Sequence, residues 1–357
     1  MKTPPLRALL LSDGKPGHHH QAEGVLAAIA RLRTVETIRL DVRRRFVIPT
    51  RTLLQFVNLG VSPAAILRIG YRLDPASLPP ADLVVSAGGE TLAANAASAK
   101  LLGVPNIFCG RLRQLAPRHV SLVLVSLESL ATHPNHLVCL PPSAFDAGRP
   151  AGRAVRLGRG NPPRRVGVLI GGNSGAFRYA GEDWRQLTAF LRDAHRTHGI
   201  GWRVTTSRRS DSAIADALTQ MAADAGCGVE TFVDVRTAGS GTLAEIFAAA
   251  DAVLCTDDST TMISEAVGAS LPVVAVRPAA TRLEAREAEY RQLLARNGWY
   301  RALLLSQLTP DAFLGALGEI APRTTSQLEE LAAALSHRLP QLFAPSPPPT
   351  TKAVPSS

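Results

Sequence analysis

A short polar segment, Asp257-Asp258-Ser259, follows a strongly apolar run and precedes an amphipathic stretch rich in hydroxyl groups. Side-chain oxygens at such a place can cap a helix, and the free N–H groups of the first turn can bind phosphate oxygens. About two turns later, Glu265 can accept hydrogen bonds from both hydroxyls of a ribose. The simpler alternative is a capped helix with Glu265 on a solvated face. We predict a nucleotide-binding segment that contains Asp258, Ser259, Thr260, Ser264 and Glu265.

A glycine-rich segment, Gly171-Gly172-Asn173-Ser174, directly follows the apolar run 166–170. Glycines let a backbone approach a phosphate closely, and consecutive N–H groups can cradle its oxygens. It is not a Walker loop, because no Gly-Lys-Ser/Thr sequence follows. A tight turn between a strand and a helix is the alternative. We predict that Gly171, Gly172, Asn173 and Ser174 contact the same ligand.

A basic turn, Ser207-Arg208-Arg209, ends the next apolar run. Two guanidinium groups beside hydroxyl groups suit a diphosphate whose charge must be neutralised as it leaves. The alternative is an exposed basic turn without a ligand. Together with the two preceding segments, this turn predicts a site for a nucleotide diphosphate, with no separate cofactor and no metal.

Three consecutive histidines follow the glycine-rich turn Asp13–Gly17. Adjacent residues cannot all face one ion, and no matching ligand spacing follows, so we do not predict a metal site. His18 is instead the first candidate for acceptor binding or general-base chemistry. Glu90, after the second glycine pair Gly88-Gly89, is the other candidate base. Its alternative role is to favour the dipole of the following helix.

The elements that must position these residues are short apolar strands alternating with longer amphipathic helices, which is typical of parallel α/β sheets. Two such series occur, and a Pro-, Gly- and Arg-rich stretch separates them. We therefore predict an α/β protein with two Rossmann-like domains facing a cleft. The expected strands are Leu6–Ser12, Glu36–Val42, Asp82–Ala87, Val104–Cys109, Leu122–Ser126, Val166–Ile170, Trp202–Thr205, Glu230–Val233, Ala252–Cys255 and Pro272–Val276.

The length of 357 residues suits two domains. We expect an acceptor-side domain over residues 1–145, a linker over 146–164 and a nucleotide-sugar domain over 165–322. A C-terminal helix is expected within 323–344 and a disordered tail over 345–357, which is rich in Pro, Ser and Thr.

The net charge is +10, and residues 1–80 alone hold twelve Lys and Arg against five Asp and Glu. Aromatic residues are few and are not interleaved with the basic ones, so we do not expect nucleic acid as a partner. Arginines near positions 43–45 and 68–72 alternate with apolar side chains from Phe46 to Ile69, which favours an anionic membrane surface. A core helix with solvated arginines is the alternative. The four cysteines form no CxxC pair, which favours buried thiols and a reducing, cytoplasmic location. Together with the basic and apolar segment, this predicts a cytoplasmic protein that is peripheral on the inner face of the membrane.

Several short motifs occur in a specific order over about residues 7–305. They are Asp13-Gly14-x-x-Gly17-His18-x-x-Gln21, Ser86-Ala87-Gly88, Gly171-Gly172, Thr206-Ser207-Arg208-Arg209 and Asp258-Ser259-x-x-Met262-x-Ser264-Glu265-Ala266. Together they resemble the bacterial family related to the plant mitochondrial-fission ELM proteins, which is GT-B-like. The last motif also resembles the donor-binding segment of GT-B glycosyltransferases and UDP-sugar 2-epimerases. The chain departs from the family pattern at Gly89-Glu90, where a basic pair is usual, and at Ser126-Leu127-Glu128, where a His-Asp pair is usual.

The resemblance implies a metal-independent glycosyltransferase that uses a nucleotide diphosphate sugar and acts on a lipid-linked or polysaccharide acceptor of the cell envelope. A nucleotide-sugar epimerase or hydrolase would share the same donor site. A recruiting protein that keeps the GT-B scaffold without catalysis is the alternative from a different class. The two departures fall in the acceptor-side half. They therefore bear on the identity of the acceptor and of the catalytic base, and not on the predicted donor site.

Overall fold

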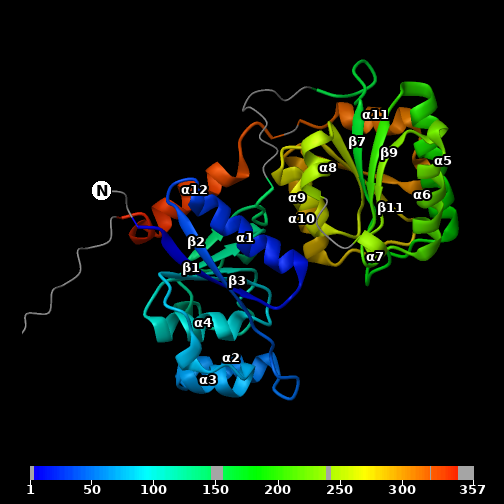
Figure 1. The fold of residues 1–357 in the computed structure, drawn as a ribbon. Helices are drawn as coiled ribbons and strands as arrows, with labels where there is room; N and C mark the ends of the chain where they lie inside the picture. The colour runs from blue at the N-terminus through cyan, green and yellow to red at the C-terminus, as the bar shows by residue number, and fades with distance from the viewer. Residues whose placement is uncertain (1–3, 146–155, 239–242, 322, 345–357) are drawn as a thin grey trace, which may run out of the picture. The chain divides into compact units, whose positions relative to one another are not determined.

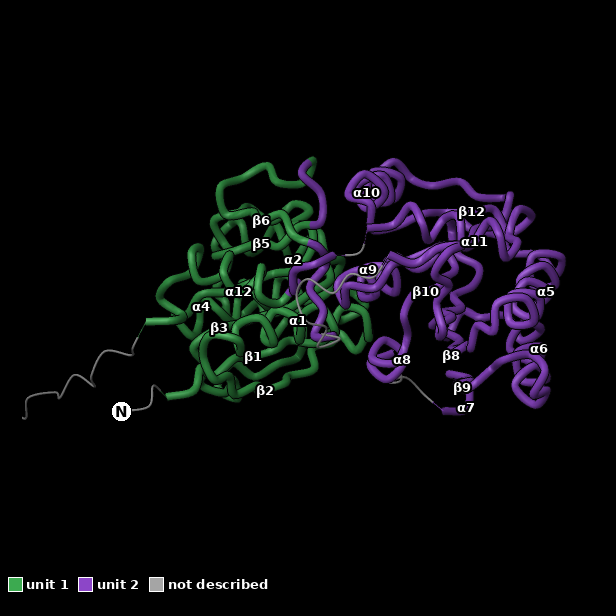
Figure 2. The backbone as a smooth tube through the Cα atoms, turned by 90° about the horizontal axis from the view of Figure 1, so that it is seen from above, with its two compact units in different colours: residues 1–125, 129–139, 328–357 green, residues 126–128, 140–327 purple. Residues whose placement is uncertain are grey.

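In the computed structural model, residues 4–145, 156–238, 243–321 and 323–344 are described, and every structural statement below concerns these ranges. The predicted tail 345–357 and residues 146–155 of the predicted linker lie outside them. The chain divides into two compact units, coloured separately in Figure 2. Unit 1 comprises residues 1–125, 129–139 and 328–357, and unit 2 comprises residues 126–128 and 140–327.

Unit 1 contains a six-stranded parallel sheet in the order β2-β1-β3-β4-β5-β6. Side chains alternate between its two faces, and both faces are covered, which explains why the strands read as nearly continuous apolar runs. The strands are β1 Leu6–Ser12, β2 Val35–Asp41, β3 Leu83–Ala87, β4 Asn106–Cys109, β5 Leu122–Val125 and β6 His136–Val138. The helices are α1 Pro16–Ala30, α2 Thr50–Asn58, α3 Pro63–Tyr71 and α4 Leu92–Leu102, with α12 Gln327–Arg338 added from the end of the chain.

Strand β1 shows how the two faces are filled. Leu9 and Leu11 pack with α2, α3 and α4 on one face. Leu6 and Leu10 pack with α1 and α12 on the other. Figure 1 shows α1 and α12 on one side of this sheet and α2, α3 and α4 on the other side. The C-terminal helix α12 is therefore part of the core of unit 1, more than 180 residues away in sequence from the preceding strand of that sheet.

Unit 2 contains a second six-stranded parallel sheet, in the order β12-β11-β10-β7-β8-β9. Helices α5, α6 and α11 cover one face, and α8, α9 and α10 cover the other (Figure 1). The strands are β7 Arg165–Leu169, β8 Gly201–Thr205, β9 Val229–Val233, β10 Ala252–Thr256, β11 Val273–Arg277 and β12 Tyr300–Leu304. The helices are α5 Gly181–His198, α6 Ser212–Ala223, α7 Val235–Ala238, α8 Leu243–Ala249, α9 Thr260–Gly268, α10 Ala285–Arg296 and α11 Pro310–Gly318.

The prediction of two Rossmann-like α/β units is confirmed, and all ten expected strands form. Strands β6 and β12 were not expected from the sequence. Helix α1 begins at Pro16, because proline in the first turn fixes a helical φ and needs no hydrogen bond for its nitrogen. His18 is therefore a first-turn helical residue and not part of a preceding turn.

The packing of α12 makes one prediction for stability. Leu335 is completely buried in unit 1, so Leu335→Ala should lower the free energy of unfolding by about 2–5 kcal/mol, because a cavity remains in the core. Glu329→Ala, on the exposed side of the same helix, should change it by less than about 0.5 kcal/mol. Urea unfolding followed by circular dichroism measures both. Equal values would mean that α12 does not contribute to the core.

Candidate functional site

In each sheet the strand order reverses at one place, and ligands of open α/β sheets bind outside the carboxyl ends of the strands at such a switch point. In unit 2 the reversal lies between β7 and β10, which pair side by side although they are distant in sequence. In unit 1 it lies between β1 and β3. The segments singled out from the sequence follow these strands, except that Ser207–Arg209 follows β8, the neighbour of β7. We call the residues after β7, β8 and β10, which are 170–174, 206–210 and 257–260, the β7–β10 edge.

The carboxylate of Asp258 joins the loops of the β7–β10 edge. Its side chain is fully buried, and it accepts hydrogen bonds from the Gly172 N–H at 3.1 Å and the Arg209 guanidinium at 2.6 Å. The Tyr179 hydroxyl donates a third hydrogen bond at 3.3 Å. Burial raises the pKa of Tyr179 and the charge of Asp258 raises it further, so this hydroxyl stays protonated. Asp258 thus holds the β7 and β8 loops together and is not a free ligand group.

The neighbouring Asp257 is also fully buried but binds a different set of groups. Its carboxylate lies 2.7 Å from a nitrogen of Arg277 and 2.8 Å from Nε of Arg291. The Tyr300 hydroxyl donates to it at 2.7 Å. Burial raises the pKa of Tyr300, and Asp257 raises it further. Asp257 therefore joins β10 to β11, α10 and β12, on the other side of the switch point from Asp258.

Close packing explains why positions 171 and 172 are glycines, apart from the ligand contacts predicted for them. A Cβ atom added at Gly171 would lie 2.3 Å from the carboxylate oxygens of Asp258. At Gly172 it would lie 1.9 Å from the carbonyl oxygen of Arg209. Both distances are far shorter than any real Cβ contact. The absence of side chains at these positions lets three loops meet.

Helix α9 carries the other predicted residues of the donor segment. Ser259 caps it, and its Oγ accepts from the Met262 N–H at 3.4 Å. Ser264 is buried, and its hydroxyl lies 2.8 Å from that of Tyr290 on α10. Glu265 is only 3% exposed, so it does not lie on a solvated face. Thr260 begins the helix, and its carbonyl accepts from Ser264 Oγ. The ribose contact of Glu265 stays a prediction.

The remaining predicted residues of the edge are more accessible. Arg208 is exposed and makes no hydrogen bond or ion pair with any described residue, and the Arg209 side chain is 47% exposed despite its link to Asp258. Ser207 Oγ accepts from the Arg209 N–H. Asn173 is exposed, although its Oδ1 accepts from the Tyr179 N–H at 2.7 Å. Ser174 is partly buried beside it. The edge thus presents two guanidinium groups to solvent.

The switch point of unit 1 holds a histidine–aspartate pair. Nδ1 of His18 lies 2.8 Å from Oδ2 of Asp13, the first residue after β1. The Asp13 side chain is only 4% exposed, whereas that of His18 is 34% exposed. Because an ionised carboxylate only accepts, Nδ1 carries the proton and Nε2 of the neutral ring is left as a base. Asp13 belongs to the motif Asp13-Gly14-x-x-Gly17-His18, but no local sequence signal assigned it a role.

The glycine pair after β3 leaves room for the side chains of His18 and Arg113 in unit 1. A Cβ atom at Gly88 would lie 2.1 Å from Nδ1 of His18, and one at Gly89 would lie 2.6 Å from the guanidinium of Arg113. Glu90 lies just before α4, and its carboxylate is 3.5 Å from Nε of Arg44. The second candidate base is thus engaged by a cation, which leaves His18 as the stronger one. Arg113 carried no sequence signal.

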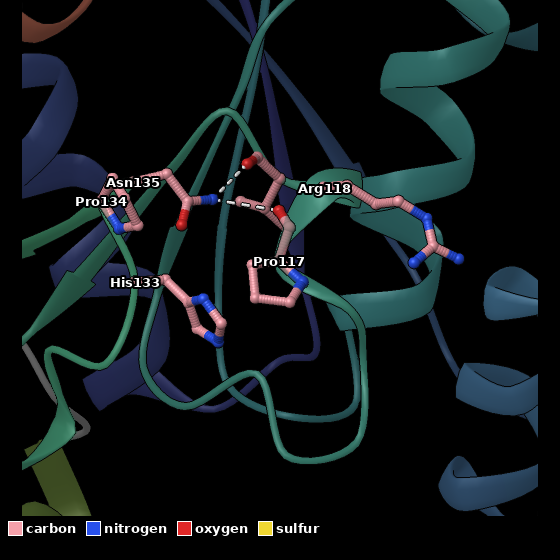
Figure 3. Close-up of a pocket in the computed structure, with 6 residues that line it drawn as sticks. Pro117, Arg118, His133, Pro134 and Asn135 are labelled. Carbon is pink, nitrogen blue, oxygen red and sulfur yellow. Dashed lines mark hydrogen bonds between the residues drawn. The ribbon is translucent and has the colours of Figure 1, made fainter.

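One cavity of unit 1, of about 330 Å³, lies at the opposite edge of the same sheet (Figure 3). Residues 117–120 precede β5 and residues 133–135 precede β6, so the cavity adjoins the amino ends of these strands. Asn135 donates from its side chain to the carbonyls of Pro117 and Val120, at 3.0 and 2.7 Å. The cavity is therefore separate from the His18–Asp13 pair.

The glycine packing at the β7–β10 edge can be tested directly. Gly172→Ala should lower the free energy of unfolding by about 1–3 kcal/mol, because the Arg209 backbone must move to admit a methyl group. Gly175→Ala is the matched control in the same loop, since no atom lies within 4 Å of its added Cβ. It should cost less than about 0.5 kcal/mol. Similar urea midpoints for the two variants would contradict the close approach.

Comparisons with known proteins agree with this architecture. The family described as "Mitochondrial fission ELM1" matches residues 16–339. Among solved structures, a UDP-GlcNAc 2-epimerase from Methanocaldococcus jannaschii is 11% identical, with a TM-score of 0.53, covering 94% of this chain and 100% of that one.

A putative UDP-N-acetylglucosamine 2-epimerase from Listeria monocytogenes is 12% identical, with a TM-score of 0.52 and coverages of 94% and 97%. CalG4, the calicheamicin glycosyltransferase, is 14% identical, with a TM-score of 0.45 and coverages of 96% and 96%. A comparison with curated proteins gave no match. The family match covers most of the sequence, and the fold similarity covers both units. The chain belongs to the mitochondrial fission ELM1 family and has a GT-B-like fold.

Proposed function

We propose that this protein transfers a glycosyl group from a nucleotide diphosphate sugar to a hydroxyl group of an acceptor. The observation that carries the proposal is the His18–Asp13 pair at the switch point of unit 1, because nucleotide binding alone would not need a base. Unit 2 would bind the donor at the β7–β10 edge. A nucleotide-sugar epimerase or hydrolase would share the donor site but would not need an acceptor.

On the donor side, the exposed guanidinium groups of Arg208 and Arg209 support the proposal. They would neutralise the diphosphate as the bond between its oxygen and the sugar C1 breaks. Asp257 and Asp258 each already hold an arginine at 2.8 Å or less, so a metal ion would have to displace that arginine. We therefore propose that the leaving group is stabilised by arginine and N–H groups, without a metal ion.

On the acceptor side, Nε2 of His18 would take the proton of the acceptor hydroxyl as its oxygen bonds to C1 of the sugar. Asp13 fixes the tautomer and stabilises the imidazolium that forms. The diphosphate leaves with the electron pair of the broken bond, so charge and protons balance. A single displacement of this kind inverts the configuration at C1.

We also propose that unit 1 lies on an anionic membrane surface that carries a lipid-linked acceptor. Helices α2 and α3 bury Leu53, Leu54, Val57, Ile66 and Leu67 in the core, so these apolar residues, expected to contribute to a surface, do not. The apolar side chains that remain exposed there are Phe46, Val47, Leu59, Val61 and Ile69. Phe46 is 95% and Leu59 80% exposed, and Arg43, Arg51 and Arg68 are exposed among them. Within the described ranges, no helix has the length and apolar character needed to cross a bilayer.

Donor binding can be measured by calorimetry with a panel of nucleotide sugars in the presence of a chelator. Arg208→Ala should weaken binding of the best ligand by about 1.5–3 kcal/mol, or about 10- to 150-fold, because charge-assisted hydrogen bonds to the diphosphate are lost. Arg196→Ala is the control and should have no effect, because Arg196 lies in the last turn of α5, close in sequence to the amino end of β8. Lack of affinity for every nucleotide sugar, or equal losses in both variants, would contradict the donor site.

Membrane binding can be measured by flotation with vesicles that contain anionic lipid. The double replacement Phe46→Ser and Val47→Ser should reduce binding at least tenfold, because burying one phenylalanine alone contributes about 1.5–3 kcal/mol. Binding should also fall as salt is raised, since each basic group near the surface contributes about 1 kcal/mol. Leu32→Ser is the control, because Leu32 is 55% exposed but lies in the turn before β2. Equal effects of the two changes would argue against a defined membrane-facing surface.

A further inference from the structure

Arg113 adopts an unusual backbone conformation in the loop after β4. Its φ is +55°, in the left-handed region that non-glycine residues rarely occupy. This conformation costs a side-chain-bearing residue about 1–3 kcal/mol and persists only where the surroundings require it. The side chain is exposed and makes no hydrogen bond or ion pair within the described ranges. Hydrogen bonds and ion pairs of its guanidinium therefore do not account for the strained backbone.

The guanidinium of Arg113 has a defined place beside the His18–Asp13 pair. It lies against Gly89, where a Cβ atom would be 2.6 Å from Cζ, Nε and a terminal nitrogen. The next residue back, Gly88, receives the imidazole of His18 in the same way. Because consecutive Cα atoms are about 3.8 Å apart, the imidazole and the guanidinium are no more than about 12 Å apart. One small molecule could contact both.

The charges around this place leave Arg113 available. The nearby carboxylate of Glu90 lies 3.5 Å from Nε of Arg44, and Asp13 is hydrogen-bonded to His18. The positive charge of Arg113 is thus paired with no carboxylate of the described residues. A planar guanidinium in this state suits the two oxygens of a phosphate or carboxylate, which it can bind through parallel hydrogen bonds.

We propose that Arg113 binds an oxyanion of the acceptor, a phosphate or a carboxylate, and so places the reacting hydroxyl at His18. This inference rests on the proposed function, because it assigns the acceptor of that reaction to the class of anionic molecules. Arg113 is then a specificity-determining residue for the acceptor. Arg113 would not contribute to binding of the donor, which unit 2 would bind.

The test uses the full chain labelled with ¹⁵N at histidine and inorganic phosphate as the probe, at pH 8 and constant ionic strength. Sodium acetate in a second series distinguishes phosphate from carboxylate. The signals of His18 are identified by their loss in His18→Gln. We expect saturable shifts of these signals with at least one anion. In Arg113→Gln the apparent affinity should fall at least tenfold, and in Arg113→Lys it should fall less, because a charge remains.

Arg118→Gln is the matched control, since Arg118 is an exposed arginine only five residues away that donates to the Asn58 carbonyl. It should leave the titration unchanged. Shifts of His18 that persist undiminished in Arg113→Gln, or no saturable shift with either anion, would overturn the proposal. Nucleotide-sugar affinity is measured on the same samples. If the unmodified protein binds no nucleotide sugar, the proposed donor site is wrong. The proposal for Arg113 is tested separately, because the anion titration needs no donor.

Discussion

The buried carboxylate of Asp258 is the interaction on which the candidate donor site depends. An ionised group without solvent is tolerated only when it is paired and hydrogen-bonded, so the chain must bring partners to it. They come from the β7 loop (Gly172), the β8 loop (Arg209) and the segment before α5 (Tyr179). Loops that would otherwise be independent are thus fixed relative to one another. The requirement extends to Gly171 and Gly172, because any side chain there would occupy the space of Asp258 or of the Arg209 backbone.

The adjacent Asp257 shows how two identical residues acquire different roles at the end of one strand. Successive side chains point to different sides, and Asp257 meets Arg277, Arg291 and Tyr300. Its partners lie on β11, α10 and β12, whereas those of Asp258 follow β7 and β8. The pair therefore ties both halves of the unit 2 sheet to the end of β10. Removing the charge of Asp257 would leave the buried Arg291 without its partner, which is among the costlier changes a protein can undergo.

In unit 1, as at the β7–β10 edge, glycines leave room for side chains that come from other segments. Gly88 and Gly89 offer no side chains, so an imidazole and a guanidinium can lie against consecutive backbone positions. One of these groups, His18, is oriented by a buried aspartate, and the other, Arg113, is paired with no described residue. Positions 89 and 90 are Gly and Glu, so they carry no basic side chain themselves. Cations nevertheless occupy the vicinity, because Arg113 lies at Gly89 and Arg44 at Glu90.

The sequence by itself determined the two α/β units, the strands that carry the site and the loops after them, because apolar alternation and glycine-rich strand ends are local signals. It also identified His18, Arg208 and Arg209 as candidates. Only the tertiary structure decided which aspartate meets which arginine, that Ser264 and Glu265 are buried, and that α12 completes the core of unit 1. It also decided that Leu53 and Ile66 lie in the core while Phe46 is exposed. These outcomes depend on contacts between segments far apart in the chain, and no local pattern encodes the partner of a buried charge or the side of a helix that meets another helix.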